Sequence, residues 1–205
     1  MHLEILNDNQ VQLLDHMQRF SNSFYLAGGT AIALHIGHRR SIDFDFFSSH
    51  ELKILKLKKI LQSIPYTRHI IFEDVDQLQI VMNKVRLTFL HYPYAINSTV
   101  WVDGFITMPD LLTLSAMKAF ALGRRAKWKD YVDLFFILKD HYSIDEVALA
   151  AKSIYADLFS EKMFRQQLAF HQDVDFTESV EFIESFALED QIIKNFLIDK
   201  ATTIF

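Results

Sequence analysis

Hydrophobic residues recur along this chain with two different periods. A spacing of three to four positions is typical of amphipathic helices, and alternation of apolar and polar positions is typical of strands with one buried face. Asn83-Lys84 stands where a tight hairpin turn would join two of the alternating segments. In the first half of the chain we predict helices at residues 8–20, 30–36 and 51–61 and strands at residues 24–27, 42–47, 68–72, 78–82 and 85–92. A last strand is expected at residues 102–107, interrupted by Gly104.

Beyond Pro109 the pattern is helical throughout. Pro109 near the start and Gly123 just past the end frame the first helix there, and Ser143 with Glu146 forms a capping box for the third. The predicted helices are 111–122, 128–139, 143–155, 161–170 and 187–201. The pattern predicts an α+β protein, in which residues 1–108 form a mixed sheet with flanking helices and residues 109–205 form an α-helical half.

The composition narrows the classes of chemistry. Half of the 205 residues are hydrophobic, 19 are phenylalanine and none is cysteine. The lack of cysteine excludes disulfides, zinc–thiolate sites and thiol catalysis. No secretory signal and no apolar run of membrane-spanning length is present, so we expect a cytoplasmic protein with no membrane partner.

The charge distribution leaves one question open. A formal net charge of −5 gives no support for bulk binding of nucleic acid. Yet Arg124, Arg125, Lys127 and Lys129 fall within six residues. This basic cluster fits a polyanion site, and it fits a solvated connection between two helices equally well.

Two carboxylates alternate along the strand at 42–47. Asp43 and Asp45 point to one face, whereas Phe44 and Phe46 point to the opposite, buried face. Two adjacent acids repel each other unless a cation neutralises them, and magnesium prefers oxygen ligands of this kind. Two metal ions about 4 Å apart would also be compatible with such a pair.

A diglycine precedes this strand. Gly28 and Gly29 stand between a strand and a short helix, where the backbone can approach a ligand and the helix N-terminus can hold a phosphate. Thr30 can cap that helix or donate its hydroxyl to a phosphate. Taken alone, the same residues are also ordinary turn chemistry.

One lysine and two aspartates mark the helical half. Lys118 lies on an apolar helical line, so it either extends to solvent or meets an anion. Asp130 and Asp133 share one face of the next helix. An acid there can pair with Lys118 or Arg125 and hold the two helices in register.

Four blocks in this order resemble the AbiEii/AbiGii toxin family of nucleotidyltransferases. They are Leu26-Ala-Gly-Gly-Thr-Ala31, His38-Arg-Arg-Ser-Ile-Asp-Phe-Asp-Phe-Phe47, Lys118 and Lys129-Asp-Tyr-Val-Asp-Leu134. The resemblance implies the nucleotidyltransferase fold of the DNA polymerase β type, with a helical C-terminal part that closes the cleft. It also implies a nucleoside triphosphate (NTP) substrate, and a toxin of a type IV toxin–antitoxin or phage-defence system.

The resemblance assigns nucleotide-binding roles to five residues. Gly28, Gly29 and Thr30 would hold the triphosphate. Arg39 and Ser41 would orient the loop or touch the nucleotide.

It assigns the chemistry to five more. Asp43 and Asp45 would bind Mg²⁺, and Lys118 would contact the triphosphate. Asp133, together with Asp130, would act as a base or orient Lys118. The partners expected are an RNA or tRNA acceptor and a cognate antitoxin protein.

One departure from the polymerase β pattern keeps rival hypotheses open. Many such enzymes bring a third carboxylate from a neighbouring strand, but the strand at 85–92 contains no acid. A non-catalytic module that binds nucleotide or protein is therefore the alternative. A toxin that acts only by protein interaction is a second alternative.

Overall fold

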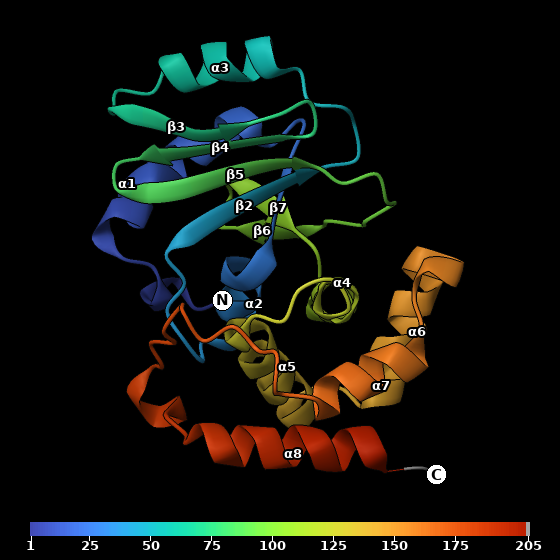
Figure 1. Ribbon diagram of the computed structural model, residues 1–205. Coiled ribbons are helices and arrows are strands. Elements are labelled where there is room, and N and C mark those ends of the chain that lie inside the picture. Colours follow the sequence, from blue (N-terminus) through green and yellow to red (C-terminus); the bar gives the residue numbers. More distant parts are fainter. Residues whose placement is uncertain (204–205) are drawn as a thin grey trace.

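A mixed five-stranded sheet forms the upper half of the molecule in the computed structural model, which describes residues 1–203 (Figure 1). The strand order is β1-β2-β5-β4-β3. β2 and β5 are parallel, and the other neighbours are antiparallel. The bounds are β1 Tyr25–Ala27, β2 Asp43–Ser48, β3 Arg68–Glu73, β4 Gln77–Met82 and β5 Val85–His91. The predicted α+β class and the predicted mixed sheet are confirmed.

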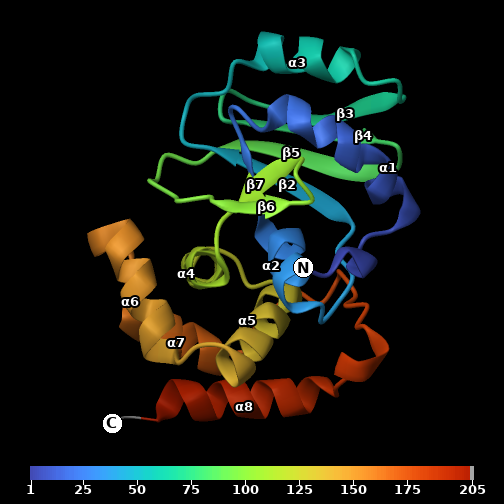
Figure 2. The ribbon, with the colours of Figure 1, turned by 180° about the vertical axis from the view of Figure 1, so that it is seen from behind.

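The two faces of the sheet differ sharply. In the buried layer Phe46 on β2 stacks with Phe89 on β5, and Phe44 packs against Phe46. Helix α1 (Asp8–Met17) crosses this face, as the view from behind shows (Figure 2), and α3 (Ile54–Gln62) buries its apolar residues beside it. The other face stays open toward the helical half, which leaves its polar side chains free for function.

The strand predicted at 102–107 is interrupted near Gly104, as expected, but the residues on the two sides do not form one strand. The chain instead forms a separate hairpin of β6 (Val100–Val102) and β7 (Ile106–Met108). Asp103 and Gly104 take φ values of 47° and 78°, and two successive left-handed residues reverse the chain. The same device joins β4 to β5 at Asn83-Lys84, as predicted.

Helices make up the lower half and agree closely with the predicted ones (Figure 1). α8 begins at Asp190 rather than at 187, and α3 begins at Ile54 rather than at 51. The helices are α2 Gly28–Ile36, α4 Leu111–Leu122, α5 Trp128–Asp140, α6 Ile144–Tyr155, α7 Glu161–Ala169 and α8 Asp190–Thr202, with 3-10 turns at Leu3–Ile5, Gln18–Phe20, Ala156–Leu158 and Glu184–Phe186.

A connecting segment, residues 170–189, returns from α7 to the sheet half before α8. The Arg40 N–H donates to the Glu181 carbonyl at 2.8 Å, and the Ile183 N–H donates to the His38 carbonyl at 3.1 Å. Buried residues from both halves belong to one core cluster. The boundary near residue 108 stays a prediction, and the segment 170–189 forms one wall of the open face.

Candidate active site

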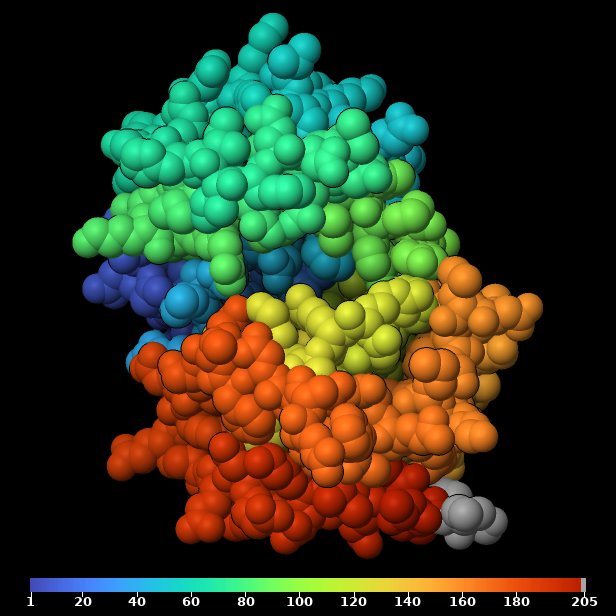
Figure 3. Space-filling view, in the orientation of Figure 1, coloured from blue at the N-terminus to red at the C-terminus, as the bar shows by residue number. Residues whose placement is uncertain are grey.

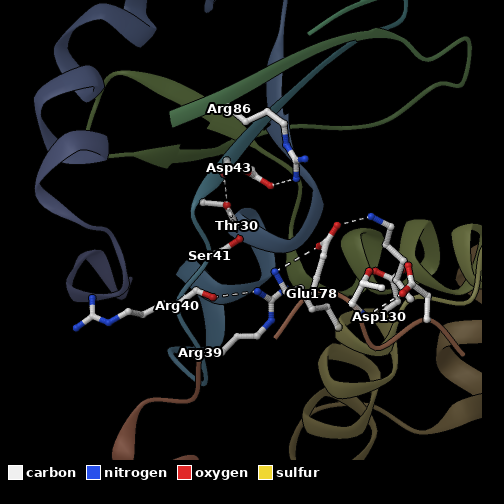
Figure 4. Close-up of polar contacts among 12 residues, drawn as sticks. Thr30, Arg39, Arg40, Ser41, Asp43, Arg86, Asp130 and Glu178 are labelled. Carbon is white, nitrogen blue, oxygen red and sulfur yellow. Dashed lines mark hydrogen bonds and ion pairs between the residues drawn. The ribbon is translucent and has the colours of Figure 1, made fainter. Parts of the chain in front are cut away.

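The acidic pair lies on the open face of the sheet, as the alternation predicts. Asp43 and Asp45 are half-buried, and the residues between and after them are buried. The parallel register places Arg86 of β5 beside Asp43 and Thr88 beside Asp45. Arg86 donates a hydrogen bond to Asp43 Oδ2 (Figure 4). The two acids are therefore in different surroundings, and only Asp43 has an ion-pair partner among the described residues.

Asp45 is a crowded carboxylate whose pKa is raised above its usual range. Burial raises its pKa, and the charge of Asp43 raises it further. The hydroxyl of Thr88 and the charges of Arg125 and Lys118 oppose this increase. A divalent cation between the two acids would relieve both causes of the increase.

The diglycine is packed directly against this pair. Gly28 has a φ of +71°, and a Cβ built on it would lie 2.2 Å from Asp45 Oδ2. A Cβ on Gly29 would lie 2.4 Å from Nη2 of Arg39. Only glycine fits either position, because any side chain would displace a group of the site.

Both glycines belong to the first turn of α2, which begins at Gly28 rather than at the predicted residue 30. The N-cap Ala27 supplies no side-chain cap. The first N–H groups of this nine-residue helix therefore lack a capping side chain at the edge of the open face. Uncapped N–H groups at a helix N-terminus favour an anion there.

Thr30 and Ser41 anchor the loop that leads into β2. The Thr30 hydroxyl donates to the Asp43 carbonyl, and it lies 2.8 Å from Ser41 Oγ (Figure 4). Gln10 Nε2 donates to the Ser41 carbonyl at 2.8 Å. Thr30 is buried, so in this structure its hydroxyl positions the acidic strand from inside the fold.

Arg39 and Asp133 form a buried bidentate ion pair. Arg39 Nε donates to Asp133 Oδ1 at 2.7 Å, and Nη2 donates to Oδ2 at 2.9 Å. His38 Nε2 donates to the same carboxylate at 2.8 Å, and Lys118 Nζ lies 2.9 Å from it. Burial alone would raise the pKa of Asp133, but Arg39, Lys118 and His38 together hold this pKa well below its usual range. A carboxylate held this way is a poor base, so the arrangement favours Asp133 as an orienting residue.

Lys118 meets anions rather than solvent. Its ammonium lies 2.6 Å from Asp130 Oδ1, and only 5% of its side chain is exposed. Burial would lower the pKa of Lys118, but the carboxylates of Asp130 and Asp133 outweigh it, so the pKa is raised and the charge is kept. Arg125 Nε donates to Asp130 Oδ2 at 3.0 Å. The expectation that an acid on α5 pairs with Lys118 or Arg125 is confirmed, because Asp130 pairs with both.

These groups surround one hollow, the polar cleft, with a volume of about 180 Å³. Figure 3 shows it between the green strands and the yellow and orange helical half. Six cationic and four acidic side chains line it, so the cleft is locally positive in an acidic protein. They are Arg39, Arg86, Lys118, Arg125, Lys127 and Lys129 with Asp43, Asp45, Asp130 and Glu178.

Sequence reasoning missed Arg86 and Glu178. The alternation along β5 places Arg86 on the open face, but only an acid on that strand would have matched the polymerase β pattern. Glu178 comes from the segment 170–189 and lies 2.5 Å from Lys127 Nζ and 3.4 Å from Lys129 Nζ. No local pattern marks Glu178, because only the return of the chain brings it to the cleft.

The basic cluster divides between two sites. Arg125, Lys127 and Lys129 line the polar cleft. The guanidinium of Arg124 lies over the ring of Phe120, 3.4 Å from its centroid, and lines a different hollow. A polyanion site therefore stays a prediction for Arg125, Lys127 and Lys129, and Arg124 does not belong to the same cleft.

The donor set fits magnesium and does not fit a metal held by protein alone. Among residues 1–203 no group of three or more His, Cys, Asp or Glu is placed to hold a metal ion. Magnesium is commonly bound through one or two carboxylates, with substrate phosphates and water as the other ligands. Asp43 and Asp45 beside a positive cleft match that mode.

Within residues 1–203 no helix has the length and apolar character needed to cross a membrane.

Comparisons with known proteins agree with this geometry. The family model of the AbiEii toxin, a nucleotidyl transferase of a type IV toxin–antitoxin system, matches residues 12–96. An uncharacterized protein of Aquifex aeolicus (strain VF5) is 30% identical over 142 residues, which are 67% of this chain and 68% of that protein.

Two solved structures share the fold. MenT4, a nucleotidyltransferase toxin of Mycobacterium tuberculosis H37Rv, matches with a TM-score of 0.63 and 14% identity, over 95% of this chain and 81% of that chain. JHP933 from Helicobacter pylori matches with a TM-score of 0.59 and 16% identity, over 98% and 88%. Identities this low show the fold alone.

Proposed function

Because this chain belongs to the AbiEii family of nucleotidyl transferase toxins of type IV toxin–antitoxin systems, we propose that it moves a nucleotide from an NTP to a hydroxyl of RNA, tRNA included, in a magnesium-dependent reaction. The cellular setting would be the cytoplasm, where NTPs and tRNA occur together. A cognate antitoxin protein would restrain it, in a toxin–antitoxin or phage-defence system.

The observation that carries the proposal is the contact between the diglycine and the acidic strand. Gly28 approaches Asp45 closely enough to exclude any side chain between them. A phosphate at the N-terminus of α2 would therefore lie next to the acids that bind the metal. Phosphoryl transfer needs this juxtaposition of phosphate, acid and cation.

Each residue then has a role in the transfer. Asp43 and Asp45 would hold Mg²⁺, which supplies charge neutralisation at the reacting phosphate and lowers the cost of ionising the acceptor hydroxyl. Lys118 and Arg125 would face the outer phosphates. Asp133 would orient Lys118 from beneath.

The reaction balances without any further reactant. The acceptor oxygen forms a bond to the α-phosphorus, and the bond from the α-phosphorus to the bridging oxygen of the β-phosphate breaks. Pyrophosphate leaves, and the proton of the acceptor hydroxyl passes to solvent.

The first prediction tests the acidic pair. Asp43→Asn and Asp45→Asn each keep the side-chain shape but remove a metal ligand. We expect transfer of label from a radioactive NTP to total tRNA to fall about a hundredfold or more, since a metal supplies several kcal/mol of transition-state stabilisation. The melting temperature of Asp45→Asn should equal or exceed that of the parent, because a repulsion with Asp43 is removed.

The control is Asp199→Asn, an exposed carboxylate on α8 in the half of the molecule away from the sheet (Figure 1). It should transfer label like the parent. Each NTP is tried separately, with magnesium and with a chelator. Transfer by the double variant Asp43→Asn/Asp45→Asn at the parent's rate would overturn the assignment.

A second candidate is a non-catalytic module that binds nucleotide. The observation in its favour is that β5 presents Arg86, not a third carboxylate, beside Asp43. Titration calorimetry with each NTP, set beside an assay for pyrophosphate, separates the two. Binding without pyrophosphate release in the presence of tRNA would favour the module.

A further inference from the structure

A second hollow, the acceptor groove, begins where the polar cleft ends. It has a volume of about 530 Å³. It shares five lining residues with the cleft and continues across the open face toward the sheet edge at β3. The shared residues are Ile42, Asp43, Arg86, Lys129 and Glu178. The two hollows therefore meet at Asp43.

The pairing of residues across the strands explains which side chains form the floor of the acceptor groove. Asp43 pairs with Arg86 across β2 and β5, and Arg86 pairs with Val81 across β5 and β4. Residues paired across strands point to the same face. One row of side chains therefore runs from the acid to the apolar Val81, away from the diglycine.

A bulge in the edge strand supplies an apolar wall. The register of β3 with β4 shifts between Ile70 and Phe72, so Ile71 is the extra residue. Ile70 and Ile71 are equally exposed, at 53% and 55%, but only Ile71 lines the groove, and Ile70 lines a hollow beside α3. Bulges commonly re-aim a side chain next to a functional site. Ile42, also 55% exposed, contributes a second apolar contact to the groove.

The rim supplies positive charge and hydroxyls. Lys84, at the β4–β5 turn, is exposed and has no ion pair within residues 1–203. Arg40 at the opposite rim pairs with Glu181 at 2.9 Å. Thr177 and Ser179 of the segment 170–189 add exposed hydroxyls. Apolar side chains can contact the bases of a single-stranded RNA, cations its phosphates and hydroxyls its sugars. The groove therefore has a group for each part of a nucleotide.

The stereochemistry of transfer fixes which hollow takes which reactant. The attacking oxygen and the leaving oxygen lie on opposite sides of the phosphorus in an in-line displacement. With the triphosphate at the N-terminus of α2, the acceptor must come from the other side of Asp43. The groove over β4 and β3 is the hollow on that side.

We propose that the acceptor groove, between the bulged edge strand and the segment 170–189, binds the single-stranded nucleotides of an acceptor RNA that adjoin its reacting hydroxyl. The inference rests on the proposed nucleotidyl transfer. Ile42 and Ile71 contact bases, and Lys84 contacts a phosphate.

The first experiment compares two neighbouring isoleucines. Ile71→Glu places a negative charge in the groove, and Ile70→Glu places the same charge on the other face of the same strand. With NTP and magnesium in excess, Ile71→Glu should raise the KM for total tRNA about tenfold or more, and Ile70→Glu should leave it near that of the parent. The KM for NTP should not change in either variant.

The second experiment uses salt. Lys84→Gln should lower the slope of log affinity against log salt by about 1 for total tRNA and for a short fluorescein-labelled single-stranded oligoribonucleotide. Lys59→Gln, an equally simple loss of charge on exposed Lys59 of α3, should not change the slope.

The outcomes separate the two proposals. A parent protein that labels no RNA refutes the proposed function and this inference together. A parent that labels tRNA, with Ile71→Glu indistinguishable from Ile70→Glu and Lys84→Gln indistinguishable from Lys59→Gln, refutes the inference alone. A parent that labels a protein instead of RNA also overturns it.

Discussion

At the scale of single residues, the site depends on positions where no side chain fits. A Cβ on Gly29 would meet the Arg39 guanidinium at 2.4 Å, and that guanidinium donates two hydrogen bonds to Asp133. The guanidinium therefore has little freedom to move aside. In the sequence the two glycines look like ordinary turn residues. In the structure Gly29 is required because it packs against the ion pair of Arg39 with Asp133.

This requirement gives a prediction with a definite sign. In a helix, Gly→Ala normally stabilises by about 0.4–1 kcal/mol. Gly29→Ala should instead destabilise by about 1–3 kcal/mol, because overpacking displaces Arg39 from its buried partner. Urea unfolding measures the difference. Gly123→Ala, whose Cβ would meet only the Phe120 carbonyl oxygen at 3.8 Å, is the control and should be neutral or stabilising. A stabilised Gly29→Ala would contradict the packing argument.

At the scale of elements, one carboxylate joins three parts of the chain. Asp133 on α5 binds Lys118 on α4 and both His38 and Arg39 in the loop before β2. All four side chains are buried or nearly so. The helical half is thereby fixed to the loop that presents Asp43.

Removal of that charge should loosen the whole junction. Asp133→Asn leaves Arg39 without its full counter-charge, and breaking a buried pair on one side costs about 3–5 kcal/mol. Chemical unfolding should show a loss in that range. Asp140→Asn on the same helix, at an exposed pair with Lys139, should change stability by no more than about 0.5 kcal/mol. Equal effects of the two substitutions would show that the buried network contributes little.

At the scale of the whole molecule, one buried and two half-buried histidines couple folding to pH. Burial lowers the pKa of His35, His38 and His171 below the usual 6.5. Each ring is therefore neutral in the folded chain over a pH range where the unfolded chain already binds a proton. Stability from this source is complete above the unfolded pKa and is lost as the pH falls below it.

We therefore expect the melting temperature to fall between about pH 7.5 and about pH 5.5. Each histidine contributes at most about 1.4 kcal/mol per pH unit to the slope of stability. His35→Gln and His171→Gln should each reduce that slope in calorimetric scans. The low pKa of Asp133 acts in a separate window, below about pH 4, where its protonation removes stability. Stability that rises on mild acidification would contradict the assignment.

The sequence by itself determined the local elements. Alternation placed Asp43 and Asp45 on one face of β2, helical spacing placed Lys118 and Asp133 on two successive helices, and the turn residues Asn83-Lys84 placed the β4–β5 hairpin. These features follow from neighbours within a few positions, which a periodic pattern records. The same logic failed at residues 102–107, because alternation does not reveal a reversal at Asp103-Gly104.

The tertiary structure alone decided which polar groups meet. His38 and Asp133 are 95 positions apart, and Lys127 and Glu178 are 51 apart. Whether such groups touch depends on how the chain returns across the sheet, which is set by burial of the core rather than by local spacing. The acceptor groove has the same origin, because it needs a bulged edge strand and a distant segment to face each other.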